Sequence, residues 1–396
     1  MITAIALVFV LLVAGGAAAQ DYDGHFSTLF SVMPDVDPAG GAQPVSELRT
    51  RLFAEGLVNP RESLHLRAGF FVDALVADRG PLGGRGATTA AIIRPADLYA
   101  EFRGTVFDVR AGMSRITWGR LDEFQPTDVV NPIDLSRFLF EGRSEARLPV
   151  ALVRGRLFLP ASSTLEAIVV PFFRASRFDQ LDEETSPFRL APLGVRERRT
   201  PATSWQNVQG GARFTSTVGR VDWGVSAWRG FEGFPAYVPQ PVGYLEVFPR
   251  FTMVGADFET VSGPWGLRGE LAWFDSVAPR SFEGGIGADR RAGNYRMALN
   301  AVVSHGDGTD LTLVGWGERT FARETRSVRL LAVYDPSDDT AFVRGIGAIS
   351  FRDNLWLEGS AGWFTGEPRG SARGAIDVLS LLSRRDFLYT RLRIHF

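Results

Sequence analysis

The sequence predicts an all-β protein: a transmembrane antiparallel β-barrel of about 18 strands, with 16 as the alternative, after a cleaved signal peptide. Three observations predict this fold. The chain ends on a segment that alternates strictly between apolar and polar side chains and closes with an aromatic residue, Phe396. The same alternation recurs along the chain, with turn signals between the segments. A short apolar run near the N-terminus has the form of an export signal.

The N-terminal run extends from Ile5 to Ala14 and is followed by small residues. This order is typical of a secretory signal peptide, and we expect cleavage after Ala19. A short membrane anchor is the alternative. We therefore divide the chain into a signal peptide, residues 1–19, and a single barrel domain, residues 20–396. No later apolar run reaches the length of a transmembrane helix, about 18 residues or more.

The final segment indicates which membrane the barrel occupies. One face of this strand carries Leu388, Thr390, Leu392, Ile394 and Phe396, and the other carries Tyr389, Arg391, Arg393 and His395. At the end of an exported chain, such a strand is typical of the closing strand of a bacterial outer-membrane barrel. We therefore expect outer-membrane lipid and lipopolysaccharide as partners. We also expect Phe396 to act as the membrane-insertion signal, read on this strand by the barrel-assembly machinery.

Internal segments repeat the pattern of apolar residues toward lipid and polar residues toward water. It is clearest in 64–74, 107–114, 265–273 and 295–303. In the first of these we expect one lipid-facing row, which consists of Leu64, Leu66, Ala68, Phe70, Val72 and Ala74. A soluble β-sandwich also alternates, but it does not need aromatic residues at both ends of its apolar stripes. The pattern therefore favours a membrane barrel.

Short and long connections alternate along the chain. The short ones are 59–62, 104, 160–162, 218–219, 262–263, 292–293, 321–323 and 352–354, and the longer ones are 34–45, 79–95, 120–149, 179–204, 232–246 and 366–384. Short turns of such barrels lie in the periplasm and longer loops lie outside. An even number of strands then requires one strand near 26–33, one at 281–291, and external connections at 305–309 and 336–339.

Charges of both signs occupy the side of the strands that is predicted to face the lumen. The candidate pore-lining residues are Arg67, Asp73, Glu101, Arg103, Asp108, Arg110, Arg268, Glu270, Arg296, Arg329, Arg344, Glu358, Arg391 and Arg393. One interpretation is that these charges pair across strands and hydrate a water-filled interior. The other is a track of arginines that favours anionic solutes. Because acids and arginines are interleaved, we expect at most weak selectivity.

The segment 120–149 mixes turn-forming with apolar residues, unlike a fully solvated loop. We expect it to fold into the barrel and narrow the pore; an ordinary external loop is the alternative. Its candidate constriction residues are Asp122, Glu123, Asp128, Asn131, Asp134 and Arg137.

Parts of this chain resemble a family. The segment from Trp118-Gly119 to Asn131-Pro132-Ile133-Asp134 leads into Leu148-Pro149-Val150, and Arg352-Asp353-Asn354-Leu355 follows the segment 335–351 before the aromatic-terminated strand. This arrangement resembles large, mostly uncharacterised Gram-negative outer-membrane barrels of porin type, and more distantly the alginate-export type. The resemblance implies a barrel that lets something cross the outer membrane.

Other function classes find little support. The net charge of -2 argues against a nucleic-acid partner, and the absence of cysteine excludes disulfides and thiolate metal sites. The four histidines show no spacing for zinc, and no Ser–His pair stands out as catalytic. We expect no enzyme activity, no cofactor and no metal.

These observations predict a porin-like channel through which small solutes pass along a charged, arginine-rich lumen. Two alternatives stay open. One is a structural or assembly barrel with a periplasmic partner. The other is an export or uptake barrel for a hydrophobic or polymeric substrate.

Overall fold

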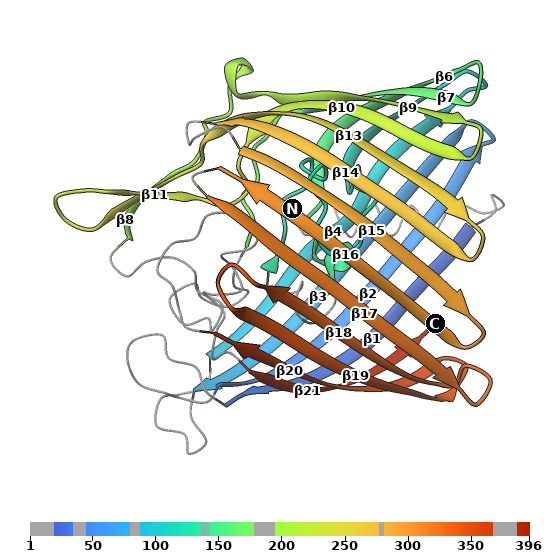
Figure 1. Ribbon diagram of the computed structural model, residues 1–396, viewed down its shortest axis with the longest axis vertical. Helices are drawn as coiled ribbons and strands as arrows, with labels where there is room; N and C mark the ends of the chain where they lie inside the picture. Colours follow the sequence, from blue (N-terminus) through green and yellow to red (C-terminus); the bar gives the residue numbers. More distant parts are fainter. Residues whose placement is uncertain are drawn as a thin grey trace.

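The computed structural model describes residues 20–34, 45–79, 88–135, 140, 142–177, 195–276, 281–306, 308–366 and 386–396. These residues form one closed antiparallel barrel of 18 strands (Figure 1). Its strands are β1 (Gln20–Met33), β2 (Val45–Arg61), β3 (Leu64–Arg79), β4 (Thr88–Arg103), β5 (Phe107–Ser114), β6 (Val150–Leu159), β7 (Ser163–Val170), β9 (Gln209–Val218), β10 (Val221–Phe231), β13 (Arg250–Ser262), β14 (Trp265–Ser276), β15 (Ser281–Ala292), β16 (Tyr295–His305), β17 (Thr309–Phe321), β18 (Arg326–Asp335), β19 (Thr340–Arg352), β20 (Leu355–Thr365) and β21 (Phe387–His395). Each strand pairs with the next in this order, and β21 pairs with β1 to close the ring. The predicted fold class and the larger strand number are confirmed.

Smaller elements lie in the connections. Strands β8 (Val195–Arg199), β11 (Ala236–Pro239) and β12 (Tyr244–Val247) form a separate sheet, which projects beyond the barrel wall in Figure 1. One helical turn, α3 (Arg143–Ala146), precedes β6, and a 3₁₀ turn, η1 (Trp205–Asn207), precedes β9. Within the described ranges, no helix combines the length and the apolar character needed to cross a membrane.

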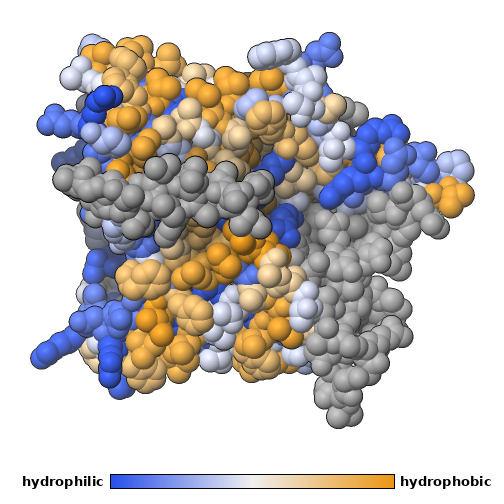
Figure 2. Space-filling model, turned by 180° about the vertical axis from the view of Figure 1, so that it is seen from behind, coloured by the Kyte–Doolittle hydropathy of each residue, from blue (hydrophilic) through white to orange (hydrophobic). Residues whose placement is uncertain are grey.

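The closing strand separates two environments, as its alternation predicts. Leu388 and Phe396 are 60% and 67% exposed on the outer wall, whereas Tyr389 and Arg391 are 1% and 7% exposed inside. Figure 2 shows apolar residues spread over the outer wall. In water so much exposed apolar surface would be unfavourable, and in a bilayer it meets hydrocarbon. The barrel therefore belongs in the bacterial outer membrane.

All the long connections lie at one end of the barrel, and the other end has only short turns. The short turns join β2–β3, β4–β5, β6–β7, β9–β10, β13–β14, β15–β16, β17–β18 and β19–β20, at the end where β1 begins and β21 finishes. Gly219, Gly263 and Gly293 enter three of these turns with positive φ angles, which favour glycine. The predicted strands near 26–33 and 281–291 exist, and the connections near 305–309 and 336–339 lie at the opposite, external end.

Three local predictions are wrong. The segment 79–95 is not all loop, because β4 already begins at Thr88. The first short turn lies after Arg61 and not at 59–62, because a register shift between Val58 and Arg61 lets β2 continue past Pro60. Phe70 is buried (8% exposed) although its row was predicted to face lipid; the pairing with β4 shifts between Ala68 and Phe70. A bulge, or a strand longer than expected, lies at each of these places; at Phe70 the bulge is on the neighbouring strand β4, and the register of β3 with β2 is unbroken there.

Candidate functional site

The connection between β5 and β6 covers residues 115–149. Its described residues, 115–135, 140 and 142–149, turn into the barrel, and we call them the inner segment (Figure 1). Glu270 on β14 holds its first part. This buried carboxylate accepts hydrogen bonds from the backbone N–H groups of Arg120, Leu121 (2.6 Å) and Thr127 (3.2 Å), and from the Thr127 hydroxyl (2.8 Å). An ionised carboxylate accepts about four such bonds, so Glu270 is fully used by the inner segment.

Ion pairs extend this attachment onto β13. The guanidinium of Arg120 pairs with Asp257 and, at 3.0 Å, with Glu259. Asp257 also pairs with Arg213 of β9 at 2.8 Å. One arginine of the inner segment therefore lies against acids of the barrel wall.

The next residues carry the opposite charge. Asp122 accepts hydrogen bonds from Arg268 (2.9 Å) and from the Trp316 indole N–H (3.1 Å), and Glu123 lies 3.7 Å from Arg329. These partners lie on β14, β17 and β18. The inner segment therefore meets several wall strands with alternating charges, each matched by a wall residue of opposite sign.

Asn131 gives the inner segment its internal shape. Its side-chain oxygen accepts from the Ile116 N–H (2.7 Å), and its amide donates to the Leu148 carbonyl (2.8 Å). Asp128 pairs with Arg147 at 2.6 Å nearby. These contacts join the entry and the exit of the segment, so that it forms a closed loop rather than two free arms.

Asp134 ties the inner segment to a third part of the wall. It pairs with Arg94 of β4 at 3.1 Å, and Arg94 also pairs with Asp73 of β3. Asp73 in turn pairs with Arg51 of β2 at 2.6 Å. All four side chains are buried, so each charge depends on the others for compensation.

Phe140 reaches the wall where the barrel closes. Its carbonyl accepts hydrogen bonds from Arg344 (3.0 Å) and from the Tyr389 hydroxyl (3.3 Å), and its ring packs edge-on against Phe387 and Tyr389. Phe140 is not among the predicted constriction residues. The predicted constriction residue Arg137 lies outside the described residues.

The wall itself carries charge clusters. Glu101 is fully buried and pairs with Arg103 (2.6 Å), Arg110 (2.8 Å) and Arg154 (2.8 Å). Similar pairs join Asp108 with Arg156, Arg67 with Glu55, Arg268 with Asp289, and Arg391 with Glu358.

All the residues predicted to line the pore lie at inward-facing positions of their strands. They are Arg67, Asp73, Glu101, Arg103, Asp108, Arg110, Arg268, Glu270, Arg296, Arg329, Arg344, Glu358, Arg391 and Arg393. They do not share one environment. Arg103 stays half-exposed, whereas Asp73 and Glu101 are fully buried among arginines. Arg154 was not predicted, although the same alternation places it on the inner face; Arg94 was not predicted because 79–95 was expected to be a connection, whereas β4 begins at Thr88.

Two apolar clusters lie inside the barrel, in the half nearer to the external loops. The charged residues on the inner face of the strands did not predict these clusters. One joins Phe140 to the walls near the closure and contains Leu29, Met33, Val45, Val314, Val333, Phe342, Phe364, Phe387 and Tyr389. The other lies against the opposite wall and contains Ile116, Trp118, Val130, Val150, Leu152, Ile168, Val170, Trp228, Phe251, Met253 and Ala272. Apolar packing therefore supplements the ion pairs that hold the inner segment.

Within the described ranges, no group of three or more His, Cys, Asp or Glu side chains is arranged to hold a metal ion. The absence of a cofactor and of enzyme activity remains a prediction.

Glu232, in the external connection after β10, makes a pH-dependent contribution to stability. Burial, with Glu283 nearby, raises the pKa of Glu232 from 4.5 to about 7. The folded state therefore binds this proton more tightly than the unfolded chain. Its contribution to stability is complete below pH 4.5 and is lost as the pH rises toward about 7.

We expect the Glu232→Gln variant to lose this part of the pH dependence. The measurement is the urea midpoint of unfolding of the lipid-reconstituted barrel, at about pH 5 and about pH 8. Glu197→Gln, an exposed acid in the same external region, is the control. An identical pH profile for wild type and Glu232→Gln would contradict the assignment.

Comparison with known proteins gives a family match over part of the chain and a fold over nearly all of it. The family described as "Protein of unknown function (DUF1302)" matches residues 93–282, which run from β4 to the start of β15 and include the inner segment. None of the curated proteins matches the sequence. Solved structures match over nearly the whole chain. A BenF-like porin from Pseudomonas fluorescens Pf-5 aligns with a TM-score of 0.56 and 10% identity, over 96% of this chain and 99% of that one.

The chain has the fold of an outer-membrane porin. OccK7 (OpdD) of Pseudomonas aeruginosa aligns with a TM-score of 0.54 and 12% identity, over 96% of this chain and 99% of that one. OccK2 (OpdF) of the same organism, in complex with glucuronate, aligns with a TM-score of 0.54 and 10% identity, over 95% of this chain and 97% of that one. At such identities the likeness concerns the porin fold and not the solute.

Proposed function

We propose that this protein is an outer-membrane channel through which small polar solutes pass along a charged lumen, and that residues 120–149 set its limiting width. The observation that supports this proposal best is that the inner segment crosses the interior and is bonded to Glu270, Arg94 and Arg344, which lie on different parts of the wall. A segment held at several points narrows a lumen without needing an energy source. Partly exposed charges at Arg67, Arg268 and elsewhere then offer a hydrated path around it.

The arrangement of charges supports weak ion selectivity. Most inward arginines have an acid within ion-pair distance, as Arg268 has Asp122 and Asp289. Paired charges leave only a small net field for a passing ion. Since OccK2 was solved with glucuronate, a carboxylated sugar is a suitable first probe, beside a neutral sugar of the same size.

The test is single-channel recording of the purified protein in a planar bilayer, with reversal potentials across a salt gradient. We expect discrete conductance steps and a small reversal potential. The double variant Arg329→Gln and Arg393→Gln removes two inward cations and is expected to shift the reversal potential toward cation preference. An unchanged reversal potential would contradict a role of these arginines in selectivity.

A structural or assembly role is the second candidate, and the two apolar clusters around the inner segment favour it. A barrel filled by its own segment conducts nothing. A folded wild-type protein that does not conduct, with conductance only after deletion of 120–149, would overturn the channel proposal and support this role.

A further inference from the structure

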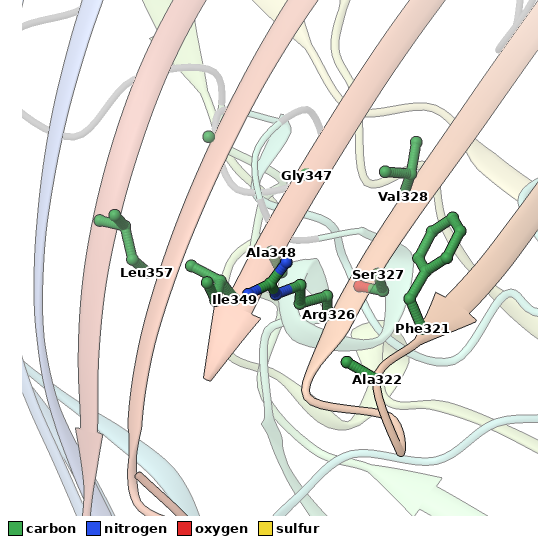
Figure 3. Close-up of a pocket in the computed structure, with 10 residues that line it drawn as sticks. Phe321, Ala322, Arg326, Ser327, Val328, Gly347, Ala348, Ile349 and Leu357 are labelled. Atoms are coloured by element: carbon green, nitrogen blue, oxygen red, sulfur yellow. The ribbon is translucent and has the colours of Figure 1, made fainter. Parts of the chain in front are cut away.

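The outer wall of the barrel carries a hollow on the side of β17 to β20, near the short turns (Figure 3). It has a volume of about 490 Å³. Residues from β17 to β20 and the turn after β17 line it, and these are Phe321, Ala322, Arg326, Ser327, Val328, Gly347, Ala348, Ile349, Leu357 and Gly359. The hollow therefore lies in the lipid-facing wall and is separate from the lumen.

Small residues that are neighbours across strands create the hollow. Val328 pairs with Gly347, which pairs with Gly359; one row further, Gly345 pairs with Ala361. Side chains point alternately inward and outward, and the exposure of Val328 places this row outside. A Cβ atom built on Gly345 or Gly347 meets no atom within 4 Å. The wall is therefore thinner here than beside it.

Two arginines border this hollow, and one of them lies on aromatic rings. Arg326 lines it directly, and Arg319 lies over the rings of Tyr295 (4.9 Å) and Phe321 (4.5 Å). Further along the same end, Arg290 lies over Trp265 (5.3 Å). Cation–π contacts hold a guanidinium at the interface without neutralising its charge.

The border of the hollow is positively charged, through Arg319 and Arg326. Among the described residues, no carboxylate lies within ion-pair distance of Arg319 or Arg326. Arg319 pairs across the strands with Val328, so Arg326 is its diagonal neighbour, about 7–8 Å away between backbones. Two long guanidinium side chains at this spacing can share one phosphate.

We propose that this surface, the hollow with Arg319 and Arg326, binds one anionic phospholipid of the periplasmic leaflet. One acyl chain fills the space over Gly347 and Gly359, and the phosphate lies between the two guanidinium groups. The short turns place the arginines at the periplasmic level of the bilayer, where headgroups lie. A lipid supplies both an apolar chain and the missing negative charge. The proposal is independent of whether solutes cross the lumen.

The test is native mass spectrometry of the full-length protein in mild detergent with added phosphatidylglycerol or phosphatidylcholine of identical acyl chains. We expect one retained phosphatidylglycerol per barrel and clearly less phosphatidylcholine. The double variant Arg319→Gln and Arg326→Gln should weaken the preference for phosphatidylglycerol by roughly tenfold, since each basic residue near a membrane surface adds a several-fold preference for anionic lipid. Gly347→Leu should reduce retention of both lipids, because its side chain enters the hollow.

Matched variants control for nonspecific effects. Gly155→Leu adds the same side chain at an outward glycine of β6 where a Cβ also meets nothing within 4 Å, and Arg220→Gln removes an exposed arginine from the β9–β10 turn. Both should retain phosphatidylglycerol as wild type does. Equal retention of the two lipids by wild type, or an unchanged preference in the double variant, overturns the proposal. Loss of an oligomer in Gly347→Leu with unchanged lipid retention assigns the surface to a second copy of the chain and overturns it as well.

Discussion

Replacing Glu270 with alanine is expected to raise the single-channel conductance and to lower the free energy of unfolding by about 3–5 kcal/mol. The carboxylate of Glu270 accepts bonds from three backbone N–H groups and one hydroxyl of the inner segment. Alanine leaves these donors buried without partners, and each such group costs about 1–3 kcal/mol. We expect the segment around Arg120 to leave the wall of β14, which widens the path if it limits the pore.

Glu259→Ala is the matched control for this prediction. Glu259 also pairs with Arg120, but its side chain is 38% exposed, and an exposed ion pair contributes only about 0–1 kcal/mol. Conductance in planar bilayers and unfolding of the reconstituted barrel by guanidinium measure the two effects. If Glu270→Ala had the same conductance and the same free energy of unfolding as wild type, the attachment of the inner segment at β14 would contribute to neither.

Deleting Phe396 is expected to reduce the amount of barrel inserted in the outer membrane several-fold. Phe396 exchanges backbone hydrogen bonds with Gly24 (3.0 and 3.2 Å), at the end of the closing contact between β21 and β1. Its ring packs over Gly24, where a Cβ would lie 2.6 Å from it, and its exposed side faces lipid. Removing it takes away an interfacial aromatic and the last bonds that close the ring.

The measurement is the fraction of protein in outer-membrane preparations that migrates as folded barrel on unheated gels. Phe351→Ser is the control, since Phe351 is also an exposed aromatic at the same end but lies on β19, away from the closure. Equal losses in both variants would show that any missing lipid-facing aromatic has this effect. No loss in the deletion would show that the terminal aromatic is dispensable.

The local alternation of apolar and polar residues was sufficient to predict the fold. Leu388 and Tyr389 are adjacent in sequence and end on opposite sides of the wall, because successive side chains of a strand point to opposite faces. Parity required an even number of strands and left 16 open beside 18. The pairing of β15 with both β14 and β16 shows that 281–292 is a strand of its own. The pattern does not predict bulges, such as the one on β4 opposite the buried Phe70, because pairing with a neighbouring strand decides where a bulge forms.

The partners of the charged residues could not be derived in this way. Nothing around Glu270 indicates that it binds the backbone of Arg120 and Leu121, since these residues are far away in sequence. The same holds for Arg94, which lies between Asp73 and Asp134. Phe140 carried no signal at all, because a single aromatic in a loop has no periodicity.

The sequence alone determined that this chain is a closed barrel with an apolar outer wall, since a period of two assigns every side chain to one of two faces. Only the tertiary structure decided which groups the inward-facing side chains contact. Some inward residues meet water and others meet the inner segment, and that choice depends on contacts between residues distant along the chain. The outer hollow has the same origin, because glycines on neighbouring strands make a depression only when the register places them side by side.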